Sequence, residues 1–251
     1  MNLVLALPRA GLVSLAVVAI ALSASPGYAL SSADIVGIAM PFDTGHVYVW
    51  YRDGTVSSGT SNDVSKYRRR YDYVMPKGYS PDDIVGIAAF PYLVLDKRTP
   101  LFDFKPVPAT IAFYKDGKYS MGVSNNLAKY HGPRQYYLPD GKQPKNIVGV
   151  SYSKKHYSNN YKKGKYDKDM AFFAFYSDGT VSAGYNPDKF YTFRKPYQYV
   201  LPTGIKPQDI VGTGCAPDTR HHYAWYKNRT VSSGVSDHLD RYRKPYSYIL
   251  P

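Results

Sequence analysis

The chain has 251 residues, of which 44% are apolar and 16% aromatic, and tyrosine alone supplies 27 positions. This composition excludes an intrinsically disordered, collagen-like or coiled-coil protein. Lysine and arginine outnumber aspartate and glutamate by 32 to 19, and the formal net charge of +13 favours acidic partners such as anionic glycans, cell-envelope polymers or nucleic acid. The single cysteine, Cys215, excludes an intramolecular disulfide, so the fold must depend on apolar burial and hydrogen bonding.

Residues 1–29 have the layout of a secretory signal peptide. One basic residue precedes an apolar run over 11–22, and Gly27 and Ala29 supply the small side chains that a cleavage site requires. The apolar run is shorter than the roughly 20 residues that a membrane-spanning helix needs. We therefore expect cleavage after Ala29 and no stable membrane span. The mature protein, residues 30–251, is expected to be secreted into the extracellular space or the periplasm.

One four-residue phrase occurs four times after the signal peptide. It reads Asp/Asn-Ile-Val-Gly and begins at Asp34, Asp83, Asn146 and Asp209. Each copy is followed by an aromatic pair, a turn, a glycine and a closing Tyr-x-x-Pro or near equivalent. The distance from the turn tyrosine to the closing proline is 25, 25, 26 and 25 residues, so the four units share one register. We assign repeats at about 34–82, 83–145, 146–208 and 209–251 and a single domain over 30–251.

Each repeat is predicted to form three or four short antiparallel strands. In the first repeat, residues 35–39 are a β-branched run, 47–51 alternate as on a pleated strand, and 55–59 return after the turn at Asp53-Gly54. A fourth strand is expected over 71–75. Asp-Gly is typical of type I′ hairpin turns, in which both central residues have positive φ.

Four such repeats indicate an all-β fold, a four-bladed β-propeller with one blade per repeat. Both faces of the middle strands are buried in such a ring, so large and small side chains should alternate. Small residues at Val49, Ala112, Ala174 and Ala224 stand beside Trp50, Phe113, Phe175 and Trp225. Repeats two and three each carry an insertion of about 14 residues at the same place. We expect these insertions to lie on one face of the ring.

The blade phrase, Asp-Ile-Val-Gly followed by Val-Tyr-x-Trp-Tyr-x-Asp-Gly, resembles the hemopexin-type four-bladed propeller. Blades of that family also start with a short Asp-containing inner strand and continue with an aromatic-rich strand. The resemblance is one of layout and spans all four repeats. The repeat logic is also similar to that of tachylectin-like and fungal propeller lectins, which bind sugars between blades. Hemopexin-type propellers generally bind proteins, glycans, ions or small ligands and are not catalytic, so the resemblance implies a binding module.

The insertion of repeat three is a candidate binding segment. Four tyrosines and six lysines interleave over residues 152–168. Aromatic faces stack on sugar rings, and lysines attract phosphate, sulfate or carboxylate. A merely solvated loop explains the pattern equally well. The candidate ligand-binding residues here are Tyr157, Tyr161, Lys162, Lys163 and Tyr166.

A basic, tyrosine-containing patch recurs at the equivalent place in repeats one, three and four. The patches cover residues 66–71, 194–197 and 241–246. One patch per blade is typical of a multivalent binder, whereas the same tyrosines also fit packing against the neighbouring blade. The candidate ligand-binding residues are Arg68, Tyr71, Arg194, Tyr197, Arg243 and Tyr246.

Residues with potential catalytic or metal chemistry have simpler interpretations. The repeated Asp of the Asp-Gly turns is replaced by Asn228 in repeat four, and Asn serves the same turn. The Asp or Asn that opens each repeat favours a loop-capping hydrogen bond. His221 and His222 are adjacent and point to opposite sides of a strand, and Cys215 is interpreted as a buried structural thiol. No catalytic motif is found, and we expect no catalytic residue, metal or cofactor.

The sequence favours a secreted, non-catalytic binding module of lectin-like character. Its expected partner is a glycan or other anionic surface polymer, and secretion argues against nucleic acid. The alternative is a protein-interaction propeller, such as an inhibitor, adhesin or toxin accessory, that binds an extracellular protein through the insertions of repeats two and three. A third hypothesis is a polysaccharide-acting enzyme, which paired carboxylates or a Tyr/His/Arg cluster in a polar pocket would favour.

Overall fold

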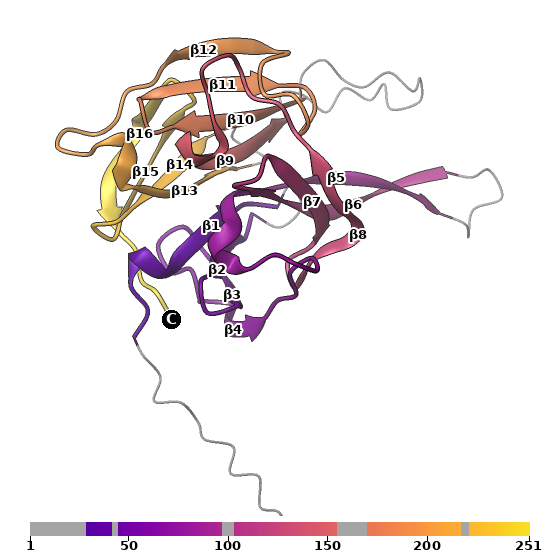
Figure 1. Cartoon of the computed structure of the whole chain (residues 1–251). Coiled ribbons are helices and arrows are strands. Elements are labelled where there is room, and N and C mark those ends of the chain that lie inside the picture. The colour runs from indigo at the N-terminus through magenta and orange to yellow at the C-terminus, as the bar shows by residue number, and fades with distance from the viewer. Residues whose placement is uncertain (1–28, 42–44, 97–102, 155–169, 217–220) are drawn as a thin grey trace, which may run out of the picture.

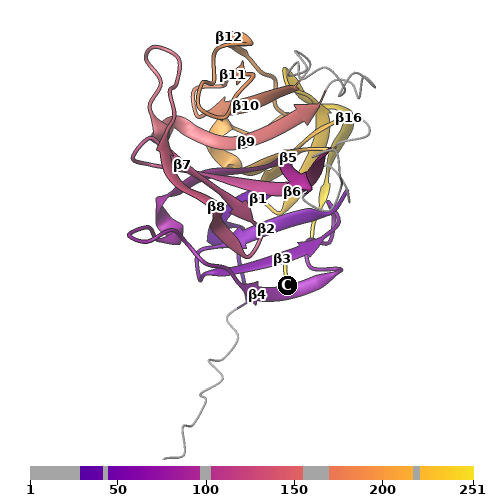
Figure 2. The ribbon, with the colours of Figure 1, turned by 90° about the vertical axis from the view of Figure 1, so that its right-hand side faces the viewer.

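The computed structural model describes residues 29–41, 45–96, 103–154, 170–216 and 221–251. Its strands form four antiparallel sheets of four strands each, and within every sheet the strands follow one another in sequence order. The four sheets are the blades of a β-propeller, which confirms the predicted all-β fold with one blade per repeat (Figure 1). Figure 2 shows β2, β3 and β4 of the first blade stacked in order toward the outside of the ring.

Each blade is preceded by a single 3-10 turn. The first blade contains β1 (Ile35–Ala39), β2 (Val47–Tyr51), β3 (Thr55–Gly59) and β4 (Arg68–Asp72). The second contains β5 (Ile84–Asp96), β6 (Asp103–Tyr114), β7 (Lys118–Val123) and β8 (Asn126–Gln135). The third contains β9 (Ile147–Lys154), β10 (Met170–Tyr176), β11 (Thr180–Gly184) and β12 (Arg194–Gln198). The fourth contains β13 (Ile210–Cys215), β14 (His222–Tyr226), β15 (Thr230–Val235) and β16 (His238–Ser247). None of the helices in these described segments is long and apolar enough to cross a membrane.

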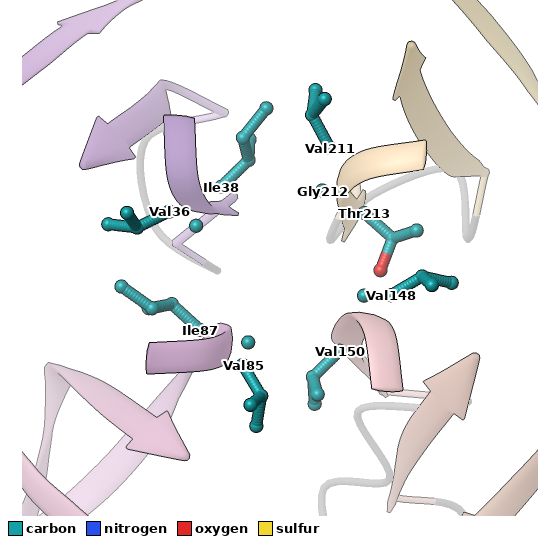
Figure 3. Close-up of a pocket in the computed structure, with 12 residues that line it drawn as sticks. Val36, Ile38, Val85, Ile87, Val148, Val150, Val211, Gly212 and Thr213 are labelled. Atoms are coloured by element: carbon teal, nitrogen blue, oxygen red, sulfur yellow. The ribbon is translucent and has the colours of Figure 1, made fainter. Parts of the chain in front are cut away.

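The four innermost strands meet in a closed ring of glycines and branched side chains, seen around the central space in Figure 3. A Cβ added at Gly37 would lie 2.5 Å from Ile87 Cγ1, and one at Gly86 would lie 2.6 Å from Val150 Cγ2. Gly149 faces Thr213 in the same way, and Gly212 faces Ile38, which returns the series to the first blade. The glycine of each Ile-Val-Gly phrase therefore receives a side chain of the next blade, and only glycine permits this approach.

The apolar core is divided among the four seams between blades. Each hydrophobic cluster combines residues of two adjacent blades, and the cluster of blades four and one contains Ile38, Val49 and Trp225. The predicted alternation of large and small residues is confirmed, because Val49 and Trp50 are both completely buried. Trp50 Nε1 donates to the Ser124 carbonyl at 2.9 Å, and Trp225 Nε1 donates to the Ser61 carbonyl at 3.0 Å. The two tryptophans thus bind the turn between the third and fourth strands of the next blade.

Buried hydroxyl groups form a hydrogen-bonded chain in each blade that contains an equivalent tyrosine pair. In blade one, Tyr73 OH donates to the Tyr51 carbonyl at 3.0 Å, Tyr51 OH lies 2.8 Å from Ser57 Oγ, and Ser57 Oγ donates to the Val64 carbonyl at 2.8 Å. The equivalent tyrosine pairs are Tyr136 and Tyr114, Tyr199 and Tyr176, and Tyr248 and Tyr226. Burial raises the pKa of Tyr51 well above its ordinary value. These hydroxyls stay protonated and satisfy the polar groups that blade packing buries.

One backbone bridge joins the outer part of every blade to the next, and the same bridge closes the ring. Between blades one and two, the Val74 N–H donates to the Asn125 carbonyl, and the Leu127 N–H donates to the Val74 carbonyl. Between blades four and one, Ile249 bonds in the same manner to Asn62 and Val64. Closure therefore uses backbone hydrogen bonds and the shared apolar cluster, as at the other seams.

The Asp-Gly turns differ from the predicted type I′ turns. Gly54 has a φ of 83°, whereas among the described non-glycine residues positive φ occurs only at Arg229, which replaces the turn glycine in blade four. Three residues separate β2 from β3, so the hairpin has a three-residue loop with its last residue in the left-handed region. The Asp53 carboxylate accepts hydrogen bonds from the Thr55 N–H and hydroxyl. This local bond explains the aspartate without requiring positive φ.

The fourth strand also differs from its prediction over 71–75, because it spans Arg68–Asp72. Tyr73 leaves the strand when its N–H donates to the Gly54 carbonyl and its ring turns inward. The phenol is then buried and bonded to the Tyr51 carbonyl.

The insertions of repeats two and three both lie between the first and second strands of their blades. In blade two, β5 and β6 remain paired as far as Asp96 and Asp103, and they extend beyond the ring as a two-stranded ribbon (Figure 1). In blade three, β9 and β10 remain paired as far as Lys154 and Met170. We call the side of the ring on which β1, β5, β9 and β13 end the insertion face.

We predict that Gly86→Ala destabilises the protein by about 1–3 kcal/mol, because the new methyl group would overlap Val150. Val150→Ala removes the closest atom, so the double variant should lose less stability than the two single losses added together. Chemical denaturation of the four proteins measures this coupling.

Gly132→Ala is the matched control, because a Cβ there would meet nothing within 4 Å. Its free energy of unfolding should stay within about 0.5 kcal/mol of the parent value. Strictly additive losses for Gly86→Ala and Val150→Ala would contradict the proposed contact.

Candidate functional site

The structure brings the predicted basic and tyrosine residues of the outermost strands together in pairs. The Arg68 guanidinium carbon lies 3.7 Å from the centre of the Tyr71 ring. Arg194 lies 3.5 Å from the Tyr197 ring in blade three. Arg243 lies 3.6 Å from the Tyr246 ring in blade four. Each arginine is exposed, whereas each tyrosine is half-buried. Three blades thus carry the same cation–π pair on their outer strand.

The tyrosines of these pairs also bind the neighbouring blade. Tyr71 OH donates to Ser124 Oγ at 3.2 Å, and Tyr246 OH lies 2.9 Å from Ser61 Oγ. Tyr197 OH lies 2.9 Å from Ser236 Oγ in the same way. One ring face is covered by arginine and the hydroxyl is bonded across the seam. These tyrosines therefore do pack against the neighbouring blade, and their fixed rings hold the arginines that lie over them.

A second aromatic feature, which the sequence analysis did not identify, lies beside each arginine. The residue just before the arginine position is aromatic in all four blades and contacts a second aromatic ring. We call these contacts the rim pairs, and they are His46–Tyr67, Tyr92–Tyr130, Tyr185–Phe193 and His221–Tyr242, with ring centres 4.3, 5.1, 5.1 and 4.1 Å apart. They lie at the insertion face, because these residues flank the strand ends on that side.

In blades one, three and four, the outer-strand ring of the rim pair is more exposed than the predicted tyrosine of the same strand, whereas both rings of the blade-two pair are half-buried. Tyr67 is 53% exposed, Tyr242 is 52% exposed and Phe193 is 41% exposed. Each adjoins an exposed arginine, as in Tyr67 beside Arg68. The signal in the sequence was an aromatic residue at one equivalent position in all four repeats. Tyr67 and Tyr242 fall inside the patches predicted over 66–71 and 241–246 but were not named as candidate residues, whereas Tyr130 and Phe193 lie outside the predicted patches.

Blade two departs from this pattern. His131 occupies the position of the arginine, and Arg134 occupies that of the tyrosine, opposite Tyr119 on β7. The Tyr119 and His131 rings lie 5.8 Å apart. This is the Tyr/His/Arg combination that would favour an enzyme, but Tyr119 is buried and its burial raises the pKa of the phenol. A raised pKa makes a tyrosine a poorer general base near neutral pH.

A cleft of about 130 Å³ lies at the seam between blades one and two. It is lined by Pro41, Tyr48, Pro108, Ala109, Thr110, Val123 and Ser124. Ala109 occupies the position that His46 holds in blade one, and the smaller side chain leaves space beside Tyr48. The cleft is well below the roughly 300 Å³ of a typical drug-sized pocket, so it fits a single ring rather than an extended ligand.

Ser124 connects this cleft to the outer strand. Its carbonyl accepts the Trp50 N–H and its hydroxyl accepts the Tyr71 hydroxyl. Tyr71 in turn carries Arg68 on its ring. The wall of the cleft is therefore held in place by two hydrogen bonds from blade one, with a guanidinium group at the outer end.

The candidate residues of the repeat-three insertion lie outside the described residues. They are Tyr157, Tyr161, Lys162, Lys163 and Tyr166. The strands on either side, β9 and β10, end at the insertion face.

The aspartates that open the repeats and the single cysteine have structural roles. The Asp34 carboxylate accepts hydrogen bonds from the Ser31 N–H and hydroxyl, which lower the pKa of that carboxyl group. Asp83 caps its 3-10 turn in the same way. Cys215 is buried. Among the residues that the structure describes, no group of three His, Cys, Asp or Glu side chains is placed to hold a metal ion.

His222 is a buried histidine at the seam between blades three and four. Its Nδ1 lies 3.1 Å from Ser151 Oγ, and its ring lies 4.8 Å from that of Phe173. Burial, with a smaller contribution from His221, lowers the pKa of His222 to about 4. The imidazole is therefore neutral in the folded protein at neutral pH.

No protein-family model matches the chain, and no curated protein matches it. Among solved structures, the chain is similar to PorZ, described as an essential bacterial surface component of the type-IX secretion system of Porphyromonas gingivalis. The similarity has a TM-score of 0.29 and 9% sequence identity and covers 86% of this chain but 21% of that chain. The chain thus spans about a fifth of the length of PorZ.

We predict that acid weakens the protein through His222. In the unfolded chain this group binds a proton near its ordinary pKa of 6.5, whereas in the folded protein the pKa is about 4. The unfolded state binds more protons between these values, so stability falls as pH drops from about 6.5 to 4 and the loss levels off below that. The full difference is about 3 kcal/mol.

His222→Val tests this assignment, because Val47 occupies the equivalent position in blade one. The free energy of unfolding of the variant should change less steeply between these pH values, as measured by urea denaturation. An unchanged slope would show that other groups cause the acid sensitivity.

Proposed function

We propose that this protein is a secreted, non-catalytic binding module that recognises acidic glycans or related anionic surface polymers. The protein acts outside the cytoplasm once the leader over residues 1–29 is removed. Its blade layout, similar to that of hemopexin-type binding propellers, is consistent with recognition rather than catalysis. The rim pairs are the primary contact sites, and the neighbouring arginines bind the acidic groups.

In blades one, three and four, an exposed aromatic ring of the rim pair stands beside an exposed arginine, and this combination supports the proposal most directly. Aromatic faces pack on the apolar C–H face of sugar rings, and guanidinium groups bind carboxylate or sulfate through two hydrogen bonds. Tyr67 with Arg68 and Tyr242 with Arg243 provide both groups side by side. Each arginine is held by the cation–π contact beneath it. Little side-chain freedom is then lost when ligand binds.

The cleft beside Tyr48 supports recognition of a single sugar ring. Tyr48 offers a half-exposed aromatic ring, and Thr110 and Ser124 offer hydroxyl groups. Arg68 is linked to the cleft wall because it lies over the Tyr71 ring, whose hydroxyl donates to Ser124. A ring that carries an acidic group satisfies both the cleft and the arginine.

The β5–β6 ribbon favours a second candidate function, capture of an extracellular protein. A paired ribbon that extends beyond the ring presents a contact surface far from the seams (Figure 1). In that case, substitution of Tyr67 and Tyr242 would leave partner binding unchanged.

We predict that Tyr67→Ala with Tyr242→Ala weakens binding to polygalacturonate by about tenfold or more at physiological salt, because two stacking surfaces are lost. Tyr137→Ala is the matched control, since Tyr137 is 52% exposed and lies outside the rim pairs. Biolayer interferometry at low and physiological salt separates stacking from screened charge attraction.

Inorganic polyphosphate serves as a polyanion without sugar rings. Equal affinity for polyphosphate and polygalacturonate, with no effect of the double variant, would reduce the interaction to charge alone and overturn the proposal. Absence of binding to every glycan probe would instead favour the protein-interaction function.

A further inference from the structure

The outermost strands of the four blades differ at one position. The register of the third and fourth strands aligns Tyr71, Arg134, Tyr197 and Tyr246 with one another. The residue just before each of them is therefore equivalent in all four blades. It is Pro133 in blade two, Pro196 in blade three and Pro245 in blade four, whereas blade one has Arg70. Within its sheet each outermost strand pairs with the third strand of its own blade. The bridges from the preceding blade reach β8 and β16 only near their first residues, at Asn126 and His238, so the rest of the other edge faces outward in the described structure.

Proline at this position removes a backbone donor from the edge. Proline is tolerated in an edge strand where the missing N–H would have pointed to solvent rather than into the ladder. Three blades therefore lack the donor at this point, and pairing with another strand is blocked there. β4 keeps its N–H at Arg70. Among the described outermost strands, β4 alone contains no proline.

The side chains of β4 leave this edge uncovered. Arg70 contacts the Asp53 carboxylate and donates to Thr55 Oγ1, both at the turn between β2 and β3 of its own blade. Arg68 lies over the Tyr71 ring. Both long side chains are therefore held on the faces of the sheet. Arg69 is exposed between them.

The charge of β4 selects the kind of strand that can pair with it. Three consecutive arginines, Arg68 to Arg70, follow the exposed Lys66. Like charges directly opposite each other destabilise a strand pair, so two copies of β4 would repel one another. An acidic strand would instead place carboxylates opposite guanidinium groups. The β5–β6 ribbon also has open edges, but Pro91, Pro106 and Pro108 interrupt them.

We propose that the edge of β4 is a docking site for an extended acidic peptide segment of a partner protein, which adds a fifth strand to blade one. Backbone hydrogen bonds from β4 supply the pairing, and the arginines select acidic side chains. This site shares Arg68 with the proposed glycan site, but it differs from that site by using the backbone edge of β4 instead of the aromatic rings.

The test uses a labelled seven-residue peptide that alternates glutamate and valine. The purified protein should bind it with one-to-one stoichiometry in fluorescence anisotropy titrations. A peptide of the same sequence that is N-methylated at alternate backbone positions keeps the charge but cannot pair along one edge. We expect its affinity to fall by about tenfold or more.

Two substitutions of Arg70 separate the backbone from the charge. Arg70→Pro, which copies the other three blades and should therefore fold, removes both the N–H and the charge. Arg70→Ala removes only the charge. We expect Arg70→Pro to weaken peptide binding at least about threefold more than Arg70→Ala, since it also removes a backbone hydrogen bond.

A gain of binding provides an independent test. Pro245→Arg restores the missing N–H and adds charge to β16, which already carries Arg241, Arg243 and Lys244. The stoichiometry for the acidic peptide should rise from one to two. Equal binding of the N-methylated peptide, or equal effects of Arg70→Pro and Arg70→Ala, would show that the arginines attract acidic peptides without strand pairing and would overturn the proposal.

Discussion

The close approach of four inner strands is the constraint on which the ring depends. Each Ile-Val-Gly phrase places a glycine where the branched side chain of the next blade must enter, and the series closes from Gly212 back to Ile38. Any side chain at the glycine positions would force two blades apart at the axis. The buried aromatic residues of the seams would then lose contact along their whole length. Close packing of the seams between blades thus depends on glycine, which has no side chain, at the axis of the ring.

Polar groups inside the ring are used for structure, and charge is left for the surface. The tyrosine and serine chains bond one another and the backbone within each blade. No buried site in them remains for a lysine or arginine. The basic residues that give the net charge of +13 accordingly gather on exposed outer strands such as β4. The interior is thus mainly hydroxyl-bonded, and the buried carboxylate of Asp240 contacts the more exposed His238 and Lys244.

The repeats made the architecture predictable, because identical packing demands at each seam leave identical phrases in the sequence. The turn type was not predictable from Asp-Gly alone, since Asp53 satisfies a local hydrogen bond instead of adopting positive φ. The patch predicted over 66–71 contains Arg68, Tyr71 and Tyr67, but the contact of Tyr67 with His46 was not predicted. Exposure depends on which ring the seam covers, and that is decided by contacts such as Tyr71 with Ser124 from a different repeat.

The backbone bridge between blades has a consequence for chain connectivity. Ile249 joins blade four to Asn62 of blade one by the same hydrogen bonds that join blades already connected in sequence. Leu30 and Leu250 pack in the same cluster at that seam. The contacts at this seam therefore do not distinguish the first blade in the sequence from the others. A circular permutant that links these two leucines and opens another linker would keep every seam between blades. The order in which the blades follow one another along the chain can therefore change by circular permutation during evolution.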